Sequence, residues 1–457
     1  MKKLASIFKN KEIVGRIFFT VMILFVIRIG AAITVPGVSI KSELADAMNS
    51  GNAISMMNLL GGGALSNFSI FALGVSPYIT SQIIVQLLSK DVLPALTELS
   101  KQGQYGRKKI EMATRYLTLL LGAVQAYGII TMMENSQYIS LTLSTSGAEA
   151  FWTYLYIITI LLAGSMLTMW LGDQITEKGL GNGISVIIFA GCVRSLPIQI
   201  STAWTKWVAA GIAIGNDTAI IRGTFQFVLY VVALLAIITG VVFFEISKRK
   251  IPVQHAGKSG QSSSMARASF LPLKVNSAGV IPVIFASSIL MAPSVIASFI
   301  SSDAAQAEWL KIFSYSEMYT MPWFNGETWK MPWGLLIYLF LIIAFTFFYS
   351  QMQIDPATLA ENFQKNGSYI PGIHPGKETE RYVSKVLNRV TFIGAMALAV
   401  ISALPVALTL SGVFGSDSSL AIGGTGMIII VGVAIELNNQ IDGLLAGKSF
   451  EEVQGGM

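Results

Sequence analysis

The sequence predicts an all-α polytopic membrane protein with ten transmembrane helices, on three observations. Apolar residues make up 53% of the 457 residues. Charged residues make up only 12%, about half of the roughly 25% that is usual in soluble domains. Apolar windows of about 20 residues, the length that crosses a bilayer as a helix, recur along the chain. The parts of the chain that lie in water are therefore short.

The ten apolar windows fall into two sets of five along the chain. In order, they cover residues 17–35, 69–88, 112–133, 151–171, 181–200, 225–246, 276–300, 333–351, 391–410 and 423–444. An even number of spans places both ends of the chain on the same side of the membrane.

Lysine and arginine are unevenly distributed between the two sides. Of the 31 such residues, 24 lie in the N-terminal tail and in every second connecting segment. The opposite segments hold six, which are Lys41, Arg194, Lys206, Arg222, Lys311 and Lys330. Because cytoplasmic segments are rich in these residues, the distribution predicts that both termini are cytoplasmic. The net charge of +6 thus belongs to one face of a membrane protein.

The start of the chain is charged like a secretory signal, but the apolar run that follows is long and offers no cleavage context. We expect residues 1–16 to form a short amphipathic surface helix that leads into a retained first span. Arg28, the remaining cation, lies inside that span. An ionised group within the bilayer is costly, so Arg28 either pairs with a neighbour or lines a functional cavity.

Composition and motifs exclude several function classes. One cysteine, Cys192, and two separated histidines, His255 and His374, give no metal cage. The stretches "HAGKSG" and "LLAGKSF" lack the first glycine of a phosphate-binding loop, since Pro252 and Asp442 occupy that place. The sequence also has no nucleophile–base arrangement. We therefore expect no catalytic site, metal or cofactor.

An ion-coupled secondary transporter is the alternative function, because such proteins also use about ten spans and broken helices. Acidic groups near the middle of the bilayer are typical of that class. Here, Glu245 and Glu436 lie near the ends of predicted spans. Two long charged segments, residues 247–274 and 352–389, point instead to docking of partners, because loops of this length often bind.

The stretch "MNLLGGGALSNFSIFALGVSPYITS", residues 57–81, is apolar but interrupted by Gly61, Gly62 and Gly63. It is either an external loop or a re-entrant element packed inside the protein, where irregular backbone is tolerated. Exposure to water would be unfavourable for Met56, Met57, Leu59, Leu60 and Leu65, which favours re-entry. Pro77 then suits the first turn of a helix that starts afresh.

Several stretches together resemble the SecY family of protein-conducting channels. They are "FVIRIGAAITVPG", "GGALSNFSIFALGVSPYIT", "MWLGDQITEKGLGNGISVIIFAG", "FLPLKVNSAGVIPVIFASSI" and "YIPGIHPGKETERY". The resemblance implies two pseudo-symmetric five-helix halves, residues 1–200 and 223–457, joined by an external hinge loop, residues 201–222. It also implies a re-entrant plug at about residues 51–67, before a second span that resumes near Ser69. The plug residues would include Asn58, Leu59, Leu60, Gly61, Gly62, Gly63 and Leu65.

The family resemblance further implies an apolar pore ring and a lateral gate. The ring would consist of Val75, Ile79, Ile184, Ile188, Ile284 and Ile429. The gate would open between the second and seventh spans, with a polar latch formed by Gln86, Thr114 and Asn276. An apolar constriction excludes water and ions when empty and offers no specific hydrogen bond to a passing polypeptide.

The family also implies partners in a bacterial plasma membrane. They are the ribosome, the SecA ATPase, the small subunits SecE and SecG, signal peptides and nascent membrane proteins. The docking candidates are Lys248, Arg249, Lys250, His374, Lys377, Arg381 and Lys385. Most family members carry arginine where this chain has His374. Since arginine keeps its charge and binds in a fixed fork, we expect His374→Arg to change the coupling to SecA.

Overall fold

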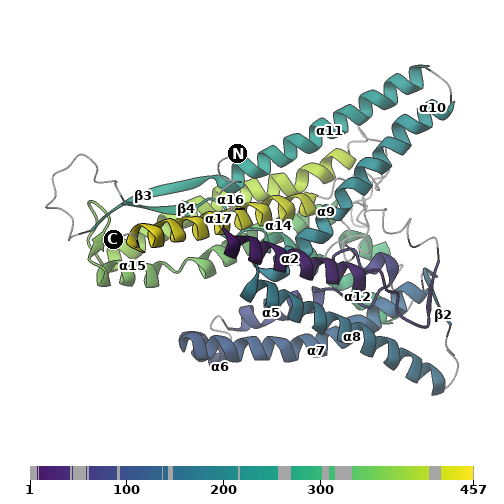
Figure 1. Cartoon of the computed structure of the whole chain (residues 1–457), viewed down its shortest axis with the longest axis horizontal. Helices are drawn as coiled ribbons and strands as arrows, with labels where there is room; N and C mark the ends of the chain where they lie inside the picture. The colour runs from purple at the N-terminus through teal and green to yellow at the C-terminus, as the bar shows by residue number, and fades with distance from the viewer. Residues whose placement is uncertain are drawn as a thin grey trace, which may run out of the picture.

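The computed structural model of the chain describes residues 8, 10–41, 44, 58, 61–89, 93–135, 137–142, 148–214, 217–255, 269–300, 308–313, 332–410 and 424–455. These residues form an elongated bundle of long helices with two small sheets at its ends (Figure 1). The predicted all-α membrane fold is therefore confirmed.

The long helices follow the predicted windows in order. They are α2 (Lys11–Gly30), α5 (Ser76–Leu88), α7 (Gly103–Asn135), α8 (Ala148–Lys178), α9 (Gly183–Ala203), α11 (Asp217–Ile246), α12 (Ile281–Ile300), α14 (Trp333–Gln353), α16 (Lys377–Leu410) and α17 (Gly424–Gly455). The shorter helices are η1 (Leu65–Asn67), α6 (Pro94–Lys101), η2 (Trp204–Ala209), α10 (Ala210–Ile214), η4 (Glu308–Phe313) and α15 (Pro356–Lys365).

The two sheets mark opposite ends of the bundle (Figure 1). At one end, β1 (Val38–Ile40) pairs antiparallel with β2 (Ile139–Leu141). At the other, β3 (Lys248–His255) lies between β4 (Ser269–Lys274) and the short β5 (Ser368–Tyr369). We call this second end, which also carries α15, the hairpin end. Both long charged segments therefore contribute ordered strands and helices to one end of the molecule.

Eight described helices are long and apolar enough to cross a membrane. The remaining two predicted spans correspond to α5, which has 13 residues, and α12, of which Ile281–Leu290 counts as a shorter apolar helix. Large apolar side chains on the outside of the bundle, such as Phe243 at 78% exposure, would be stable only in lipid. The chain is a multi-pass membrane protein.

Local sequence signals fix several helix starts. The Asn182 side chain accepts a hydrogen bond from the Ile184 N–H at 3.1 Å and caps α9. The Asp355 side chain caps α15 in the same way, just before Pro356. Pro77 lies in the first turn of α5, as predicted, since its missing N–H has no partner to lose there.

The helices surround a continuous apolar core. On one side, α9 packs against α17, and Gln440 of α17 accepts a hydrogen bond from the Gly181 N–H at 2.7 Å. On another side, α12 packs against α7 and α14 and also touches α5. The largest cluster of buried apolar residues contains side chains from both sides. The first five and last five long helices thus meet along two seams.

Three boundary predictions are wrong. Residues 201–222, expected to be a loop, are helical through η2, α10 and the start of α11, apart from 215–216, which lie outside the described residues. Arg194, which the charge count assigned to an external segment although the window 181–200 contains it, lies within α9. The second span begins at Ser76 rather than near Ser69. Hydropathy reports which residues favour lipid, and it marks neither the true end of a helix nor a break inside an apolar run.

Candidate functional site: a central apolar cluster and the segment packed on it

The six pore-ring candidates belong to one apolar cluster. Val75, Ile79, Ile188, Ile284 and Ile429 are buried members, and Ile184 is partly buried against them. They come from the start of α5, from α9, α12 and α17. The structure therefore brings together four helices that are far apart in sequence, with only aliphatic side chains at these positions.

Residues 61–67, which we call the glycine segment, pack tightly against neighbouring backbone. A Cβ atom added at Gly191 of α9 would lie 2.4 Å from the Gly62 Cα atom. A Cβ atom at Gly74 would lie 2.5 Å from the Gly61 Cα atom. Side chains do not fit at these distances, so the close approach requires glycine. This segment is folded into the protein, as the re-entrant interpretation predicted.

Hydrogen bonds stabilise the turn within the glycine segment. The Gly63 N–H donates to the Asn58 carbonyl at 2.7 Å, and the Ser66 N–H donates to the Asn58 side chain at 3.0 Å. Leu65 is completely buried. Of the predicted plug residues, Leu59 and Leu60 lie outside the described residues. The others surround this single turn.

Arg194 makes a contact to the glycine segment from α9. Its Nη1 atom donates to the Gly63 carbonyl at 2.9 Å. A Cβ atom added at Gly63 would lie 2.6 Å from the same Nη1 atom. The guanidinium therefore lies directly against the backbone of this segment.

The predicted latch residues each have another hydrogen-bond partner. Gln86 of α5 accepts from the Tyr349 hydroxyl of α14. Thr114 donates to the Ile110 carbonyl in its own helix at 2.9 Å. Asn276 donates to the Glu245 carboxyl group at 2.8 Å. No described hydrogen bond joins two of the three predicted residues.

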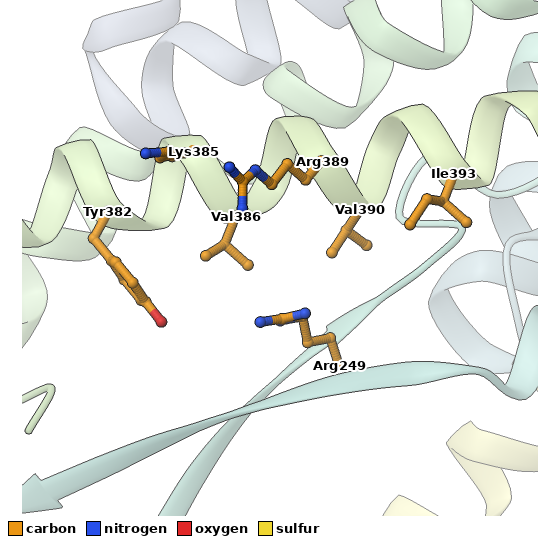
Figure 2. A pocket seen from close by; sticks show the side chains of 7 residues that line it. All are labelled: Arg249, Tyr382, Lys385, Val386, Arg389, Val390 and Ile393. Carbon is orange, nitrogen blue, oxygen red and sulfur yellow. The ribbon is translucent and has the colours of Figure 1, made fainter.

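The basic docking candidates lie at the hairpin end. Arg249 on β3 and Lys385 on α16 line one pocket of about 380 Å³. Figure 2 shows the side chains that line it, from the strand on one side and the helix on the other. Tyr382, Arg389 and the apolar Val386, Val390 and Ile393 complete the lining. The pocket thus combines three cations with an apolar wall.

The other docking candidates are exposed on the same elements or next to them. Lys248 and Lys250 are on β3, and Lys377 and Arg381 are in the first turns of α16. His374 is exposed in the turn before α16. Its backbone N–H donates to the Glu378 carboxylate at 3.4 Å. The described residues contain no group of three His, Cys, Asp or Glu that could hold a metal.

Comparison with known proteins identifies the family. Residues 69–438 match the SecY family. The chain is 42% identical over 451 residues to the protein translocase subunit SecY of Lactococcus lactis subsp. lactis, which covers 98% of this chain and 97% of the relative. The chain belongs to the SecY family. It is similar also to SecY of Bacillus subtilis, at 41% identity over 451 residues, covering 98% of this chain and 97% of the relative.

Solved structures share the SecY fold. A structure described as a protein conducting channel has a TM-score of 0.64 and 16% identity, covering 93% of this chain and 91% of that chain. Sec61 in a canine ribosome-channel complex has a TM-score of 0.60 and 15% identity, covering 93% of this chain and 91% of that chain. At these identities, the likeness shows the common fold.

The structure adds three site residues that the sequence did not single out for the SecY-type roles. Arg194 is an isolated charge in an apolar stretch, and Glu245 is one of few acidic residues near a span. Both charges are unusual at such positions and could have been noticed in the sequence. Tyr349 gave no signal, because a tyrosine at the end of an apolar window is common. Its partner lies 263 residues away in sequence.

Proposed function

We propose that this chain forms the channel of a protein translocase, through which unfolded secretory polypeptides cross the membrane. The observation that carries the proposal is the gathering of six predicted ring residues from four helices in one apolar cluster. An aliphatic constriction gives a seal against ions and holds no side chain that would retain a particular sequence. The glycine segment, packed beside α9, acts as the plug.

The two sets of five helices form the halves, residues 1–200 and 223–457, and the helical connection between them is the hinge. The lateral gate lies where α12 meets α5 and α7. Contact of α12 with both helices supports this placement. An apolar segment of the substrate leaves through this gate into lipid, which is favourable by roughly 0.3–0.6 kcal/mol for each central Leu or Ile.

The hairpin end binds the driving partners in the cytoplasm of a bacterium, and both termini lie on that side. Exposed cations on β3 and α16 support a docking surface for a ribosome or for the SecA ATPase, which supplies the energy. Small SecE-type and SecG-type subunits complete the complex. The named relatives are translocase subunits, which does not support the ion-coupled transporter alternative.

Disulfide trapping tests this function at the ring. In a Cys192→Ser background, Ile79→Cys is combined with an arrested precursor that carries a single cysteine. We expect a disulfide whose yield depends on the position of the precursor cysteine. Phe243→Cys on the lipid-facing side of α11 is the matched negative control, since this side chain is 78% exposed.

The possible outcomes distinguish a misplaced ring from a wrong function. No adduct at Ile79→Cys, although the precursor is protected inside vesicles and reacts elsewhere along the chain, would show that the ring is misplaced. No adduct at any ring position, together with an unprotected precursor, would overturn the channel.

A further inference from the structure

Arg194 is a cation inside a predicted span whose described hydrogen-bond acceptor is a backbone carbonyl. Its Nη1 atom lies 2.9 Å from the Gly63 oxygen, and the side chain is half-buried. Among the described residues, no carboxylate pairs with it. Arg28, which has the same charge, acts on it electrostatically. Within the described part of the chain, the Gly63 carbonyl is therefore the acceptor for this guanidinium, and it also accepts from the Ser66 hydroxyl at 2.8 Å.

The contact joins two parts of the protein that the proposed mechanism must separate. Gly63 belongs to the glycine segment, which must leave the pore, whereas Arg194 belongs to α9, which also supplies Ile184 and Ile188 to the ring. At Gly61 and Gly62, the close contacts of the segment are between backbone atoms, and the neutral Asn67 side chain donates to the Ala31 carbonyl at the end of α2 at 3.4 Å. Among the described contacts, Arg194 is thus the charged one that a membrane helix makes to this segment.

We infer that Arg194 is a positioning residue that latches the plug in the closed channel. This inference rests on the proposed function. A half-buried, ionised guanidinium is stabilised by an acceptor, and the Gly63 carbonyl provides it while the plug is in place. A translocating polypeptide presents chemically equivalent peptide carbonyls. The passing chain therefore replaces Gly63 as the acceptor, so the hydrogen bond is exchanged when the plug leaves.

The first test is the resting ion conductance of the full-length protein, with its partner subunits, in planar bilayers. We expect Arg194→Leu to raise the resting conductance roughly tenfold, equivalent to about 1.4 kcal/mol, because the closed state loses one hydrogen bond. Lys41→Leu is the matched control, because it removes one exposed cation on the predicted same side of the membrane. It should leave the resting conductance unchanged.

A second pair of variants tests the contact from the plug side with Arg194 intact. Gly62 and Gly63 both have positive φ, +71° and +80°, so alanine strains the backbone at either position. At Gly63, the new Cβ would also lie 2.6 Å from Arg194, whereas at Gly62 the nearest atom is 3.9 Å away. We expect Gly63→Ala to raise the conductance more than Gly62→Ala. The difference should disappear in an Arg194→Leu background, because residues in contact are not additive.

The outcomes distinguish the latch from the channel itself. If the wild-type channel conducts when a precursor is engaged but Arg194→Leu has the same resting conductance as the wild type, the latch is overturned and the channel stands. An equal effect of Gly62→Ala and Gly63→Ala would also overturn the latch. A wild-type protein that neither exports nor conducts with a precursor would overturn the proposed function and this inference with it.

Discussion

Asn276 and Glu245 form a buried hydrogen bond at the end of the bundle where α11 enters β3. The Asn276 amide donates to Glu245 at 2.8 Å and to the Gly279 carbonyl at 3.1 Å. The two side chains are only 1% and 7% exposed. A buried polar group without a partner is destabilising, so each of these side chains depends on the other.

Replacing Asn276 should therefore destabilise the protein as well as affect the gate. We expect Asn276→Leu to lower the free energy of unfolding by about 1–3 kcal/mol, because the Glu245 carboxyl group is left without its donor. The midpoint of thermal unfolding in detergent measures this effect. The double variant Glu245→Leu/Asn276→Leu should lose less than the sum of the single losses. Additive losses would show that the pair does not contribute as a unit.

At the scale of elements, α14 joins the two helices of the proposed gate. Tyr349 donates to Gln86 of α5. The next residue, Ser350, shares a hydrogen bond with Ser277, just before α12, at 3.0 Å, and another with Thr391 of α16 at 2.6 Å. Adjacent residues of one helix thus contact both sides of the gate. When the gate opens, either one of these hydrogen bonds breaks or α14 moves together with the helix to which it is bonded.

This arrangement predicts that Tyr349 controls the strictness of signal selection. Tyr349→Phe removes the hydroxyl but keeps the ring, whose centroid lies 5.0 Å from that of Phe285. We expect Tyr349→Phe to increase export of a precursor with a weak signal by several-fold, to the same extent as Gln86→Leu. The double variant should add nothing further, because both changes remove one hydrogen bond.

Export rates in inverted vesicles measure this effect, with a strong-signal precursor as the control. Unchanged export of the weak-signal precursor in both single variants would remove the Gln86–Tyr349 pair from the gate. Independent, additive effects of the two changes would show that each residue acts through another partner.

The elements differ in how far the sequence predicts them. Each of the ten apolar windows contains a helix, because hydrophobicity and helix formation coincide inside a membrane. The extension of α9 through η2 and α10 was missed because Lys206 and its polar neighbours ended the apolar window without ending the helix. The three adjacent glycines predicted a break before α5. They did not predict where the break ends, because its length depends on the tertiary contact between Gly61 and Gly74.

The site residues, too, could be predicted only in part from sequence patterns. The six ring positions came from the family resemblance, since a lone isoleucine in a membrane protein carries no positional signal. Contacting pairs of residues were harder to predict from the sequence. Gln86 and Tyr349 are 263 residues apart, and Arg194 and Gly63 are 131 residues apart. Such pairs depend on the mutual placement of helices, which periodicity does not encode.

At the scale of the whole molecule, cations at the hairpin end predict salt-dependent binding of a large partner. Arg249→Glu combined with Lys385→Glu reverses two charges at one pocket. We expect the Kd for ribosomes to rise at least roughly tenfold at low salt, about 1.4 kcal/mol. The difference should shrink as salt is raised, because exposed charges are screened. Sedimentation with ribosomes measures it.

The control for this prediction lies at the opposite end of the bundle. Lys41 is exposed next to β1, and Lys41→Glu should leave the Kd unchanged. A similar loss from Lys41→Glu would mean that net charge, rather than the pocket, governs binding. Unchanged binding by the double variant would remove Arg249 and Lys385 from the docking surface.

The same two ends predict the orientation of the protein in its membrane. In a Cys192→Ser background, Lys41→Cys and Lys377→Cys place single thiols at exposed positions at opposite ends. A membrane-impermeant maleimide added to cells whose outer barriers have been removed should label Lys41→Cys at once, and Lys377→Cys only after permeabilisation. The reason is that segments rich in Lys and Arg stay in the cytoplasm, and β3 and the first turns of α16 are such segments. Labelling in the reverse order would place β3 and α16 outside the cell, where neither a ribosome nor an ATPase could reach them, and would overturn the docking proposal without affecting the ring.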